Sequence, residues 1–146
     1  MDGDALKLEN QLCFPLYAAA KEVVNLYKPM LEQLDLTYTQ YIAMMVLWEH
    51  RSVGVKELGR YLYLDSGTLT PLPKRLEGKG YVRRERDAAD ERAVIITITA
   101  AGEALREQAG AIPPYMQTCL PLSPEEAGAL YALLYKLLNH LNGENN

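Results

Sequence analysis

The 146-residue chain has little of what metal sites and disulfide scaffolds need. It holds two cysteines, Cys13 and Cys119, and two histidines, too few thiols for a four-cysteine zinc site or a disulfide framework. No stretch reaches the roughly 18 consecutive apolar residues of a membrane-spanning helix. The first residues, MDGDALKLENQL, lack the basic-then-apolar pattern of a secretory signal. We therefore expect a cytoplasmic, single-domain protein with no metal, no cofactor and no membrane partner.

The net charge of −4 is unevenly distributed along the chain. Residues 1–54 and residues 100–146 each carry a net charge of −3, whereas residues 55–99 carry +2. A basic centre between acidic ends is typical of a localised surface that binds a polyanion. A solvated charged hairpin has the same charges and no partner, so charge alone leaves both interpretations open. The densest stretch, residues 74–86, contains Lys74, Arg75, Lys79, Arg83, Arg84 and Arg86.

Apolar periodicity and capping residues predict helices at both ends of the chain. A helix is expected over residues 12–34, where Pro29 should kink it or end it early. Thr37 and Gln40 form a capping-box pattern that predicts a second helix to about His50. Near the C-terminus, a helix after Thr99 should run to Pro113-Pro114. The sequence Ser-Pro-Glu-Glu at residues 123–126 predicts the start of the last helix.

The middle of the chain combines two short helices with a pair of strands. Residues 55–62 form the first short helix. Asp65 begins a second one, continued by leucines at three- and four-residue steps and ended by Gly78 and Gly80. Residues 81–86 and 94–99 then form a β-hairpin with a charged tip. This order predicts a mainly α protein with a small β-hairpin wing, the winged helix-turn-helix, whose second short helix enters the major groove of DNA.

The two terminal helical regions are amphipathic and exceed what a winged-helix core needs. We expect residues 10–34 and 100–141 to form a dimerisation region, and residues 37–99 to form the DNA-binding part. A two-fold dimer places its two reading helices about 34–36 Å apart, one turn of DNA. The alternative is a monomer whose ends fold over its own surface.

Several short motifs in this order resemble the MarR-type transcriptional regulators, and within them the organic-hydroperoxide sensors of the OhrR type. The similarity covers about residues 10–108 and joins a reading-helix motif to a thiol motif and two tyrosines. It implies a homodimeric repressor that binds double-stranded operator DNA and is not an enzyme. The motifs are LDSGTLTPL at residues 64–72, KRLE at 74–77, DER at 90–92, LCF at 12–14, LY at 16–17, YKP at 27–29, LTY at 36–38 and QY at 40–41.

The resemblance assigns the redox chemistry to four side chains. Organic hydroperoxide, the inducer, would oxidise Cys13, and the hydroxyls of Tyr27 and Tyr38 would donate hydrogen bonds to its thiolate. Only the thiolate reacts with peroxide, and a helix N-terminus and phenolic donors both favour that anion. Cys119 resembles the resolving thiol of the two-cysteine subgroup, whose bridge would join Cys13 of one subunit to Cys119 of the other. A mixed disulfide is the other end state left open.

The spacing of Cys13 and Tyr27 has a consequence for assembly. Fourteen residues of continuous helix span about 21 Å at 1.5 Å per residue. Tyr27 therefore does not reach Cys13 of its own helix, whereas an antiparallel second copy brings a tyrosine alongside. Partner-subunit tyrosines are also what the resemblance implies.

The DNA-binding residues follow from the reading helix and the wing. Hydroxyls and backbone N–H groups at a helix start bind base edges or phosphates, and basic side chains bind phosphates. Arg92 matches the family's minor-groove arginine, and Asp90 is expected to orient it. Pro73 departs from the family's aliphatic residue and is expected to bend the reading helix. The remaining candidates are Ser66, Gly67, Thr68, Thr70, Lys74, Arg75, Arg84 and Arg86.

Two other functions remain open at this point. A MarR-type regulator with an inert Cys13 would be released by a small phenolic or lipophilic ligand. A thiol peroxidase would consume peroxide catalytically, although no acid or base lies near either cysteine in the sequence.

Overall fold

The computed structural model describes residues 3–143, and the chain divides into two compact units, residues 1–114 and residues 115–146. Among residues 3–143, no helix combines the length and hydropathy that crossing a bilayer requires. The elements are η1 Gly3–Leu6, η2 Leu8–Asn10, α1 Cys13–Gln33, α2 Tyr38–His50, β1 Ser52–Gly54, α3 Val55–Leu62, α4 Ser66–Leu69, α5 Leu72–Gly78, β2 Val82–Arg86, β3 Val94–Ile98, α6 Ala100–Ala109, α7 Ile112–Cys119 and α8 Pro124–Gly143.

Helix α2 forms the centre of the first unit. Its start is the predicted capping box, because Thr37 accepts from the Gln40 backbone while the Gln40 side chain accepts from the Thr37 N–H. Met44 and Leu47 are fully buried on this helix. At its far end the Trp48 indole donates a 2.9 Å hydrogen bond to a carbonyl of α6, so α2 is tied to the segment after the wing.

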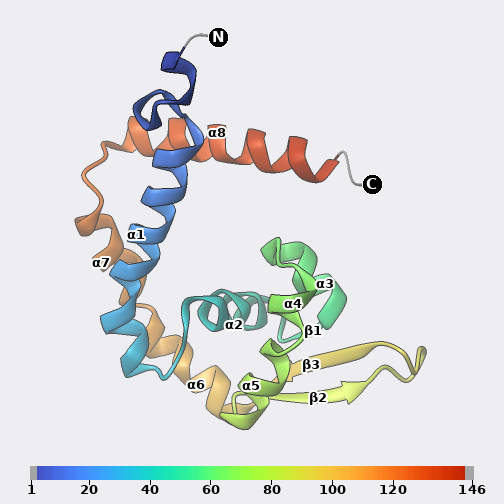
Figure 1. Ribbon diagram of the computed structural model, residues 1–146. Helices are drawn as coiled ribbons and strands as arrows, with labels where there is room; N and C mark the ends of the chain where they lie inside the picture. The colour runs from blue at the N-terminus through green and yellow to red at the C-terminus, as the bar shows by residue number, and fades with distance from the viewer. Residues whose placement is uncertain (1–2, 144–146) are drawn as a thin grey trace. The chain divides into compact units, whose positions relative to one another are not determined.

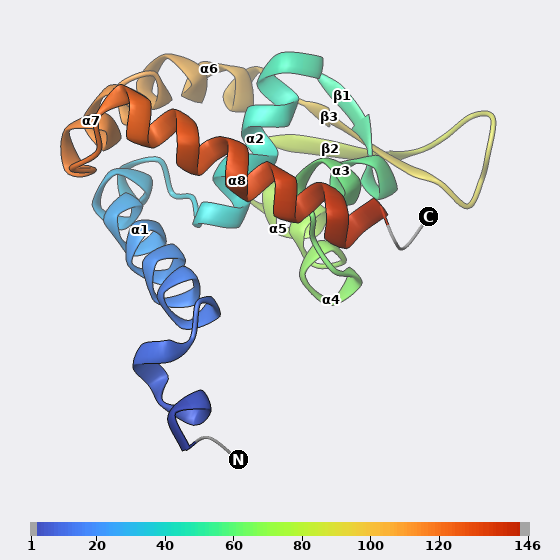
Figure 2. The same cartoon turned by 90° about the horizontal axis from the view of Figure 1, so that it is seen from above.

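The wing is the predicted hairpin, with β2 antiparallel to β3 and Arg84 opposite Ile96. Strand β1 adds a third strand on the other side of β3, with Val53 opposite Ile96. Strand β1 is not predictable from the sequence, because three residues are too short for a periodic pattern. Figures 1 and 2 both show the β2–β3 loop extending away from α2 and α6. This projection makes the loop accessible to a macromolecular partner.

The reading helix is interrupted, which corrects the expectation of one continuous second helix. It consists of α4 and α5 with a turn at Thr70 and Pro71 between them. Proline has no N–H, so Pro71 and Pro73 each remove one hydrogen bond that would join the two segments. Pro73 then lies at the second position of α5, where an N–H has no intrahelical partner. The expected bend is therefore a break, located just before α5.

Two further expectations for the helices need correction. Of the two outcomes expected at Pro29, a kink or an early end, the early end is wrong, because α1 continues through Pro29 to Gln33. Helix α6 ends at Ala109, before Pro113-Pro114, and those prolines lie in the first turn of an additional helix, α7. Proline is tolerated in a first turn, which explains why the pair begins a helix and does not simply stop one. Cys119 consequently ends α7.

Candidate functional site

The first segment of the reading helix exposes short polar side chains at its start. Asp65 accepts a 2.8 Å hydrogen bond from the Thr68 backbone, and this bond lowers the pKa of its carboxyl. The cap fixes the direction of α4, on which Ser66, Gly67 and Thr68 are all exposed. Thr70 follows in the turn, where its hydroxyl donates to the Ser66 carbonyl at 2.6 Å. The Thr70 oxygen therefore presents its free lone pairs to solvent as an acceptor.

Helix α5 separates its apolar and basic side chains. Leu72 and Leu76 are buried in the first unit, at 3% and 0% exposure. Lys74 and Arg75 are exposed on the same helix. The helix thus anchors itself through its leucines and directs two cations to solvent, as a surface that contacts a phosphate backbone requires.

The wing holds Arg84 in a defined position. Its guanidinium meets the Glu77 carboxylate at 3.0 Å, and its backbone N–H donates to the same group at 3.0 Å. These hydrogen bonds lower the pKa of Glu77, so the carboxylate stays ionised. Arg84 is therefore partly neutralised and orders the contact between α5 and β2.

The tip of the hairpin is a hydrogen-bonded turn that carries Arg92. Arg86 donates to the Glu91 carbonyl at 2.6 Å across the base of the turn. Asp90 accepts from the backbone N–H of Arg92 at 3.0 Å, so its contact is with the turn that presents Arg92. Arg86, Asp90 and Arg92 are all exposed. The turn thus directs two arginines of the wing to solvent.

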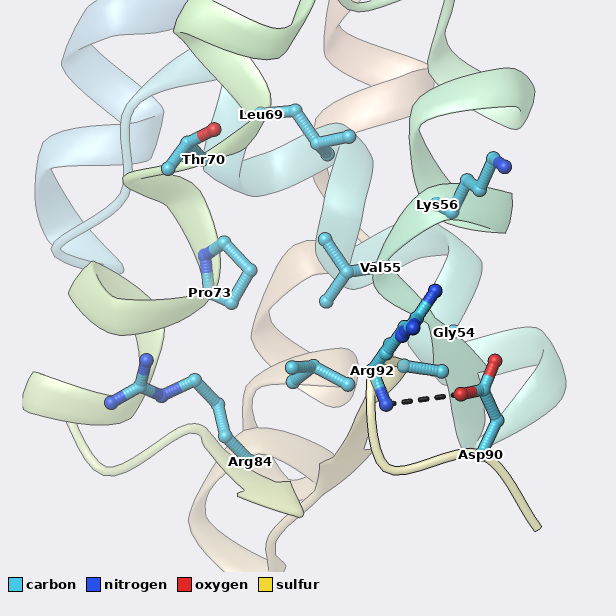
Figure 3. A pocket seen from close by; sticks show the side chains of 11 residues that line it. Gly54, Val55, Lys56, Leu69, Thr70, Pro73, Arg84, Asp90 and Arg92 are labelled. Atoms are coloured by element: carbon cyan, nitrogen blue, oxygen red, sulfur yellow. Dashed lines mark hydrogen bonds between the residues drawn. The ribbon is translucent and has the colours of Figure 1, made fainter. Parts of the chain in front are cut away.

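A cavity of about 650 Å³ lies between the wing and the reading helix. Figure 3 shows Thr70 and Pro73 on one side, Val55 and Lys56 on another, and side chains of the wing completing it. Arg84 and Arg92 both line this space. The cavity therefore combines an apolar floor with cations, on the surface that carries the DNA-binding candidates.

Lys79, which sequence analysis counted in the basic stretch, is not part of this surface. Its ammonium donates to the Asp35 carbonyl at 2.5 Å and to the Gln40 side chain at 2.9 Å. Its side chain is only 25% exposed. Charge counting along the sequence does not reveal that a lysine is already bound within the protein.

Tyr27 and Tyr38 come together from different helices. Their ring centroids are 4.9 Å apart, and Tyr41 joins them at 5.8 Å from Tyr27. Burial raises the pKa of all three phenols. They therefore keep their protons at neutral pH and remain hydrogen-bond donors. Tyr41 was not among the predicted site residues, although its three-residue spacing from Tyr38 places both on one helix face.

Cys13 is the first residue of α1 and is exposed. Because α1 is unbroken between them, Cys13 and Tyr27 of the same chain are separated by about 21 Å of helix. The neighbouring Phe14 and Leu16 are each 43% exposed. In a single chain the thiol of Cys13 and the phenol of Tyr27 therefore lie at separate places on α1, with apolar side chains beside the thiol.

Cys119 lies at the end of α7 in the second unit and is half-buried. A side-chain hydrogen bond with Cys119 raises the pKa of Tyr115, one helical turn earlier. Both cysteines are free thiols. Within residues 3–143, no group of three or more potential ligands is arranged to hold a metal ion.

Comparison with known proteins identifies the class. A family model described as "Transcriptional regulator SarA/Rot" matches residues 25–108. The organic hydroperoxide resistance transcriptional regulator of Bacillus subtilis (strain 168) is 47% identical over 142 residues, 97% of each chain. A structure of reduced AbfR bound to DNA is 35% identical and covers 100% of both chains, with a TM-score of 0.79. A disulfide-formed AbfR structure is 37% identical over 94% of each chain, with a TM-score of 0.66.

These similarities extend along nearly the whole chain and agree with the fold. They exclude the peroxidase interpretation, because the family consists of transcriptional regulators. The three-stranded wing and the two-segment reading helix are the parts of a winged helix-turn-helix. The chain belongs to the MarR-type winged helix-turn-helix transcriptional regulators, within which it groups with the organic hydroperoxide regulators of the OhrR type.

Proposed function

We propose that the protein is a homodimeric repressor that binds operator DNA and is released when an organic hydroperoxide oxidises Cys13. The observation that carries this proposal is the separation of thiol and phenols along α1. Tyr27 and Tyr38 carry protonated hydroxyls that can donate hydrogen bonds, but Cys13 of their own chain lies too far along α1 to accept them. An antiparallel second copy brings Cys13 of one subunit beside the tyrosines of the other.

Exposed apolar side chains on the terminal helices support a dimer. A monomeric soluble protein rarely leaves so many large apolar groups in water along one helix. We assign residues 10–34 and 100–141 to the interface and residues 37–99 to DNA binding. The exposed groups include Leu12, Phe14, Leu16, Tyr17 and Leu26 on or beside α1, and Leu130, Tyr131, Leu133, Tyr135, Leu137 and Leu141 on α8.

The reaction at Cys13 needs only the protein and the peroxide. The thiolate attacks the terminal peroxide oxygen, the O–O bond breaks, and the alkoxide leaves and is protonated to an alcohol. Sulfur is thereby oxidised to a sulfenic acid. The thiol of Cys119 of the second subunit then displaces water and forms a disulfide. A relative that has been solved in a disulfide-formed state supports this end product.

The operator contacts follow from the exposed groups of the first unit. Ser66, Gly67, Thr68 and Thr70 would bind base edges and phosphates in the major groove. Arg92, presented by the Asp90 turn, would enter the minor groove. Lys74, Arg75, Arg84 and Arg86 would bind or steer the phosphates. Such a regulator acts where the chromosome lies, which is the cytoplasm in a bacterium.

Operator binding under peroxide tests the proposal. Wild type, Cys13→Ser and Cys119→Ser are titrated against labelled operator DNA, before and after one equivalent of cumene hydroperoxide. Wild type should lose affinity, whereas Cys13→Ser should bind equally in both conditions. In Cys119→Ser, Cys13 should still be oxidised. Mass spectrometry should not show the loss of two hydrogens per cysteine pair that a disulfide produces. Release of Cys13→Ser by peroxide would reject thiol sensing.

The cavity in Figure 3 favours a second candidate function. Its two arginines and Thr70 suit a small phenolic or carboxylate anion, and an occupant there would compete with DNA. In that case Cys13→Ser should be released by the small anion as readily as wild type. Arg84→Met should abolish that release while leaving the oxidation of Cys13 unchanged.

A further inference from the structure

Two side chains from the segment between α5 and β2 hold the corner where α1 turns into α2. Lys79 donates to the Asp35 carbonyl at 2.5 Å and its ammonium lies 3.4 Å from the Asp35 carboxylate. The Tyr81 hydroxyl donates to the Leu34 carbonyl at 3.0 Å. These bonds join residues more than forty positions apart in the chain. The end of the reading helix is therefore fastened directly to the helix corner.

Gln40 is the buried centre of this arrangement. It is 4% exposed, and among the buried residues of the described part of the chain it is the one with a polar side chain besides the aromatic ones. Its amide oxygen accepts from the Thr37 N–H at 3.1 Å and from the Lys79 ammonium at 2.9 Å. The same atom thus caps α2 and binds the end of the reading helix, so neither partner moves without disturbing the other.

The corner lies beside the tyrosines of the sensing site. Tyr38 is the first residue of α2, two positions before Gln40, and Tyr41 follows Gln40 directly. The phenolic rings of these two tyrosines are 6.2 Å apart. A change in the contacts of Tyr38 consequently displaces the first turn of α2, where the Gln40 oxygen accepts its hydrogen bonds.

On its other side, the segment is rigidly joined to the wing. Gly80 adopts a left-handed φ of 81°, which glycine accommodates without strain, and ends α5. The Gly80 carbonyl accepts from the Thr99 hydroxyl at 2.6 Å, and the Tyr81 carbonyl accepts from the Thr99 N–H at 3.1 Å. Residues 79–81 are thus held between the reading helix, the wing and the start of α6.

We propose that Gln40, Lys79 and Tyr81 form a polar clamp that transmits the state of the tyrosine cluster to the reading helix and wing. These are positioning residues, since none of them belongs to the proposed thiol site or to the proposed operator contacts. The inference rests on the proposed redox function. It gives Lys79, a lysine of the basic stretch, a role in coupling the tyrosine cluster to the reading helix and wing, and not a role in binding phosphate.

The test measures a coupling factor, defined as the ratio of operator dissociation constants for oxidised and reduced protein. Lys79→Met keeps the aliphatic stem and removes the donors, and Tyr81→Phe keeps the ring and removes one hydroxyl. Each should lower the coupling factor by about fivefold or more, within the usual range of allosteric coupling. Reduced-state affinity and the rate of Cys13 oxidation should stay within about twofold of wild type, because neither site is touched.

Controls separate coupling from a merely structural role. Lys7→Met makes the same substitution at an exposed position outside the assigned interface and should leave the coupling factor unchanged. Gln40→Glu keeps an acceptor for Lys79 and should preserve coupling, whereas Gln40→Leu should lose it. A wild-type coupling factor in both Lys79→Met and Tyr81→Phe would overturn the clamp. Absence of any peroxide response in wild type would instead reject the proposed function, and the clamp with it.

Discussion

Tyr27 on α1 and Tyr38 at the start of α2 hold their ring centroids 4.9 Å apart, with their planes inclined by 59°. This pairing places two protonated hydroxyls at one site, although their parent residues belong to different helices. In the proposed function this pair is half of a thiolate-binding site, and the unbroken helix α1 keeps Cys13 of the same chain at its other end. The proposed function therefore requires a second chain to supply the thiol.

Removing either hydroxyl should slow the oxidation of Cys13. Tyr27→Phe and Tyr38→Phe retain the ring contact and delete one hydrogen bond to the thiolate. A bond to a charged group contributes about 1.5 kcal/mol or more, which corresponds to a rate lowered about tenfold. Stopped-flow measurement of sulfenic acid formation with cumene hydroperoxide gives the rate. Tyr131→Phe, which alters the similar ring pair on α8, is the matched control and should react as wild type. Equal rates in all variants would remove the tyrosines from the chemistry.

Salt dependence should identify the phosphate contacts. Each phosphate neutralised by a basic side chain adds about 0.9 to the slope of log affinity against log salt concentration. Lys74→Ala and Arg75→Ala should each weaken operator binding and reduce that slope by about one. Fluorescence anisotropy between low and moderate salt provides both quantities. Lys7→Ala removes the same charge at an exposed position outside both the DNA-binding part and the assigned interface. A slope reduced equally by that change would contradict the assignment.

The free energy of unfolding should decrease at alkaline pH, because the phenols of the tyrosine cluster are buried or half-buried. Burial raises the pKa of Tyr27, Tyr38 and Tyr41 above the ordinary value of 10.0. Above that pH the unfolded chain releases phenolic protons that the folded chain retains. The unfolding free energy is therefore fully present below pH 10 and is lost as pH rises toward the folded-state values.

Urea unfolding at about pH 9 and about pH 11 measures this loss, which is at most about 1.4 kcal/mol per pH unit for each phenol. Tyr41→Phe removes one titrating group and should make the decline shallower. A decline of the same size in Tyr41→Phe would show that this phenol ionises equally in the folded and unfolded chains.

Gly102 should tolerate no side chain. A Cβ atom built there lies 2.3 Å from the Tyr81 carbonyl oxygen and 2.9 Å from a carbon of Ile98. Gly102→Ala forces α6 away from the wing and is expected to cost about 1–3 kcal/mol of unfolding free energy, as overpacked cores do. Thermal unfolding measures the loss. Gly128→Ala on α8, where a Cβ meets nothing within 4 Å, is the comparison and should not lower stability.

The elements with strong local signals were predictable from the sequence. The capping boxes at Thr37 and Ser123 each satisfy two backbone groups at once, and both form as expected. The hairpin followed from its alternating β-branched residues. The dense basic stretch predicted solvent-facing cations, and Lys74, Arg75, Arg84 and Arg86 are exposed. These features depend on neighbours within a few positions, so local chemistry determines them.

The features that the sequence did not predict depend on contacts between residues far apart in the chain. Strand β1 exists because Val53 pairs with Ile96, and nothing near Val53 signals that partner. The sequence predicts that Lys79 is a surface cation, because nothing near it indicates its bonds to Asp35 and Gln40. The break before α5 was foreseen only as a bend, since the sequence does not show whether two prolines deform one helix or divide it.

Mixed dimers test most directly the claim that the sensing site is completed across subunits. In one dimer, the first subunit carries Cys13→Ser, and the second keeps Cys13 but carries Tyr27→Phe and Tyr38→Phe. In the other dimer, all three substitutions are in one subunit and its partner is wild type. The oxidation rate of the remaining Cys13 should be that of wild type in the first dimer and slowed in the second. A slowed first dimer together with a wild-type second dimer would contradict the account.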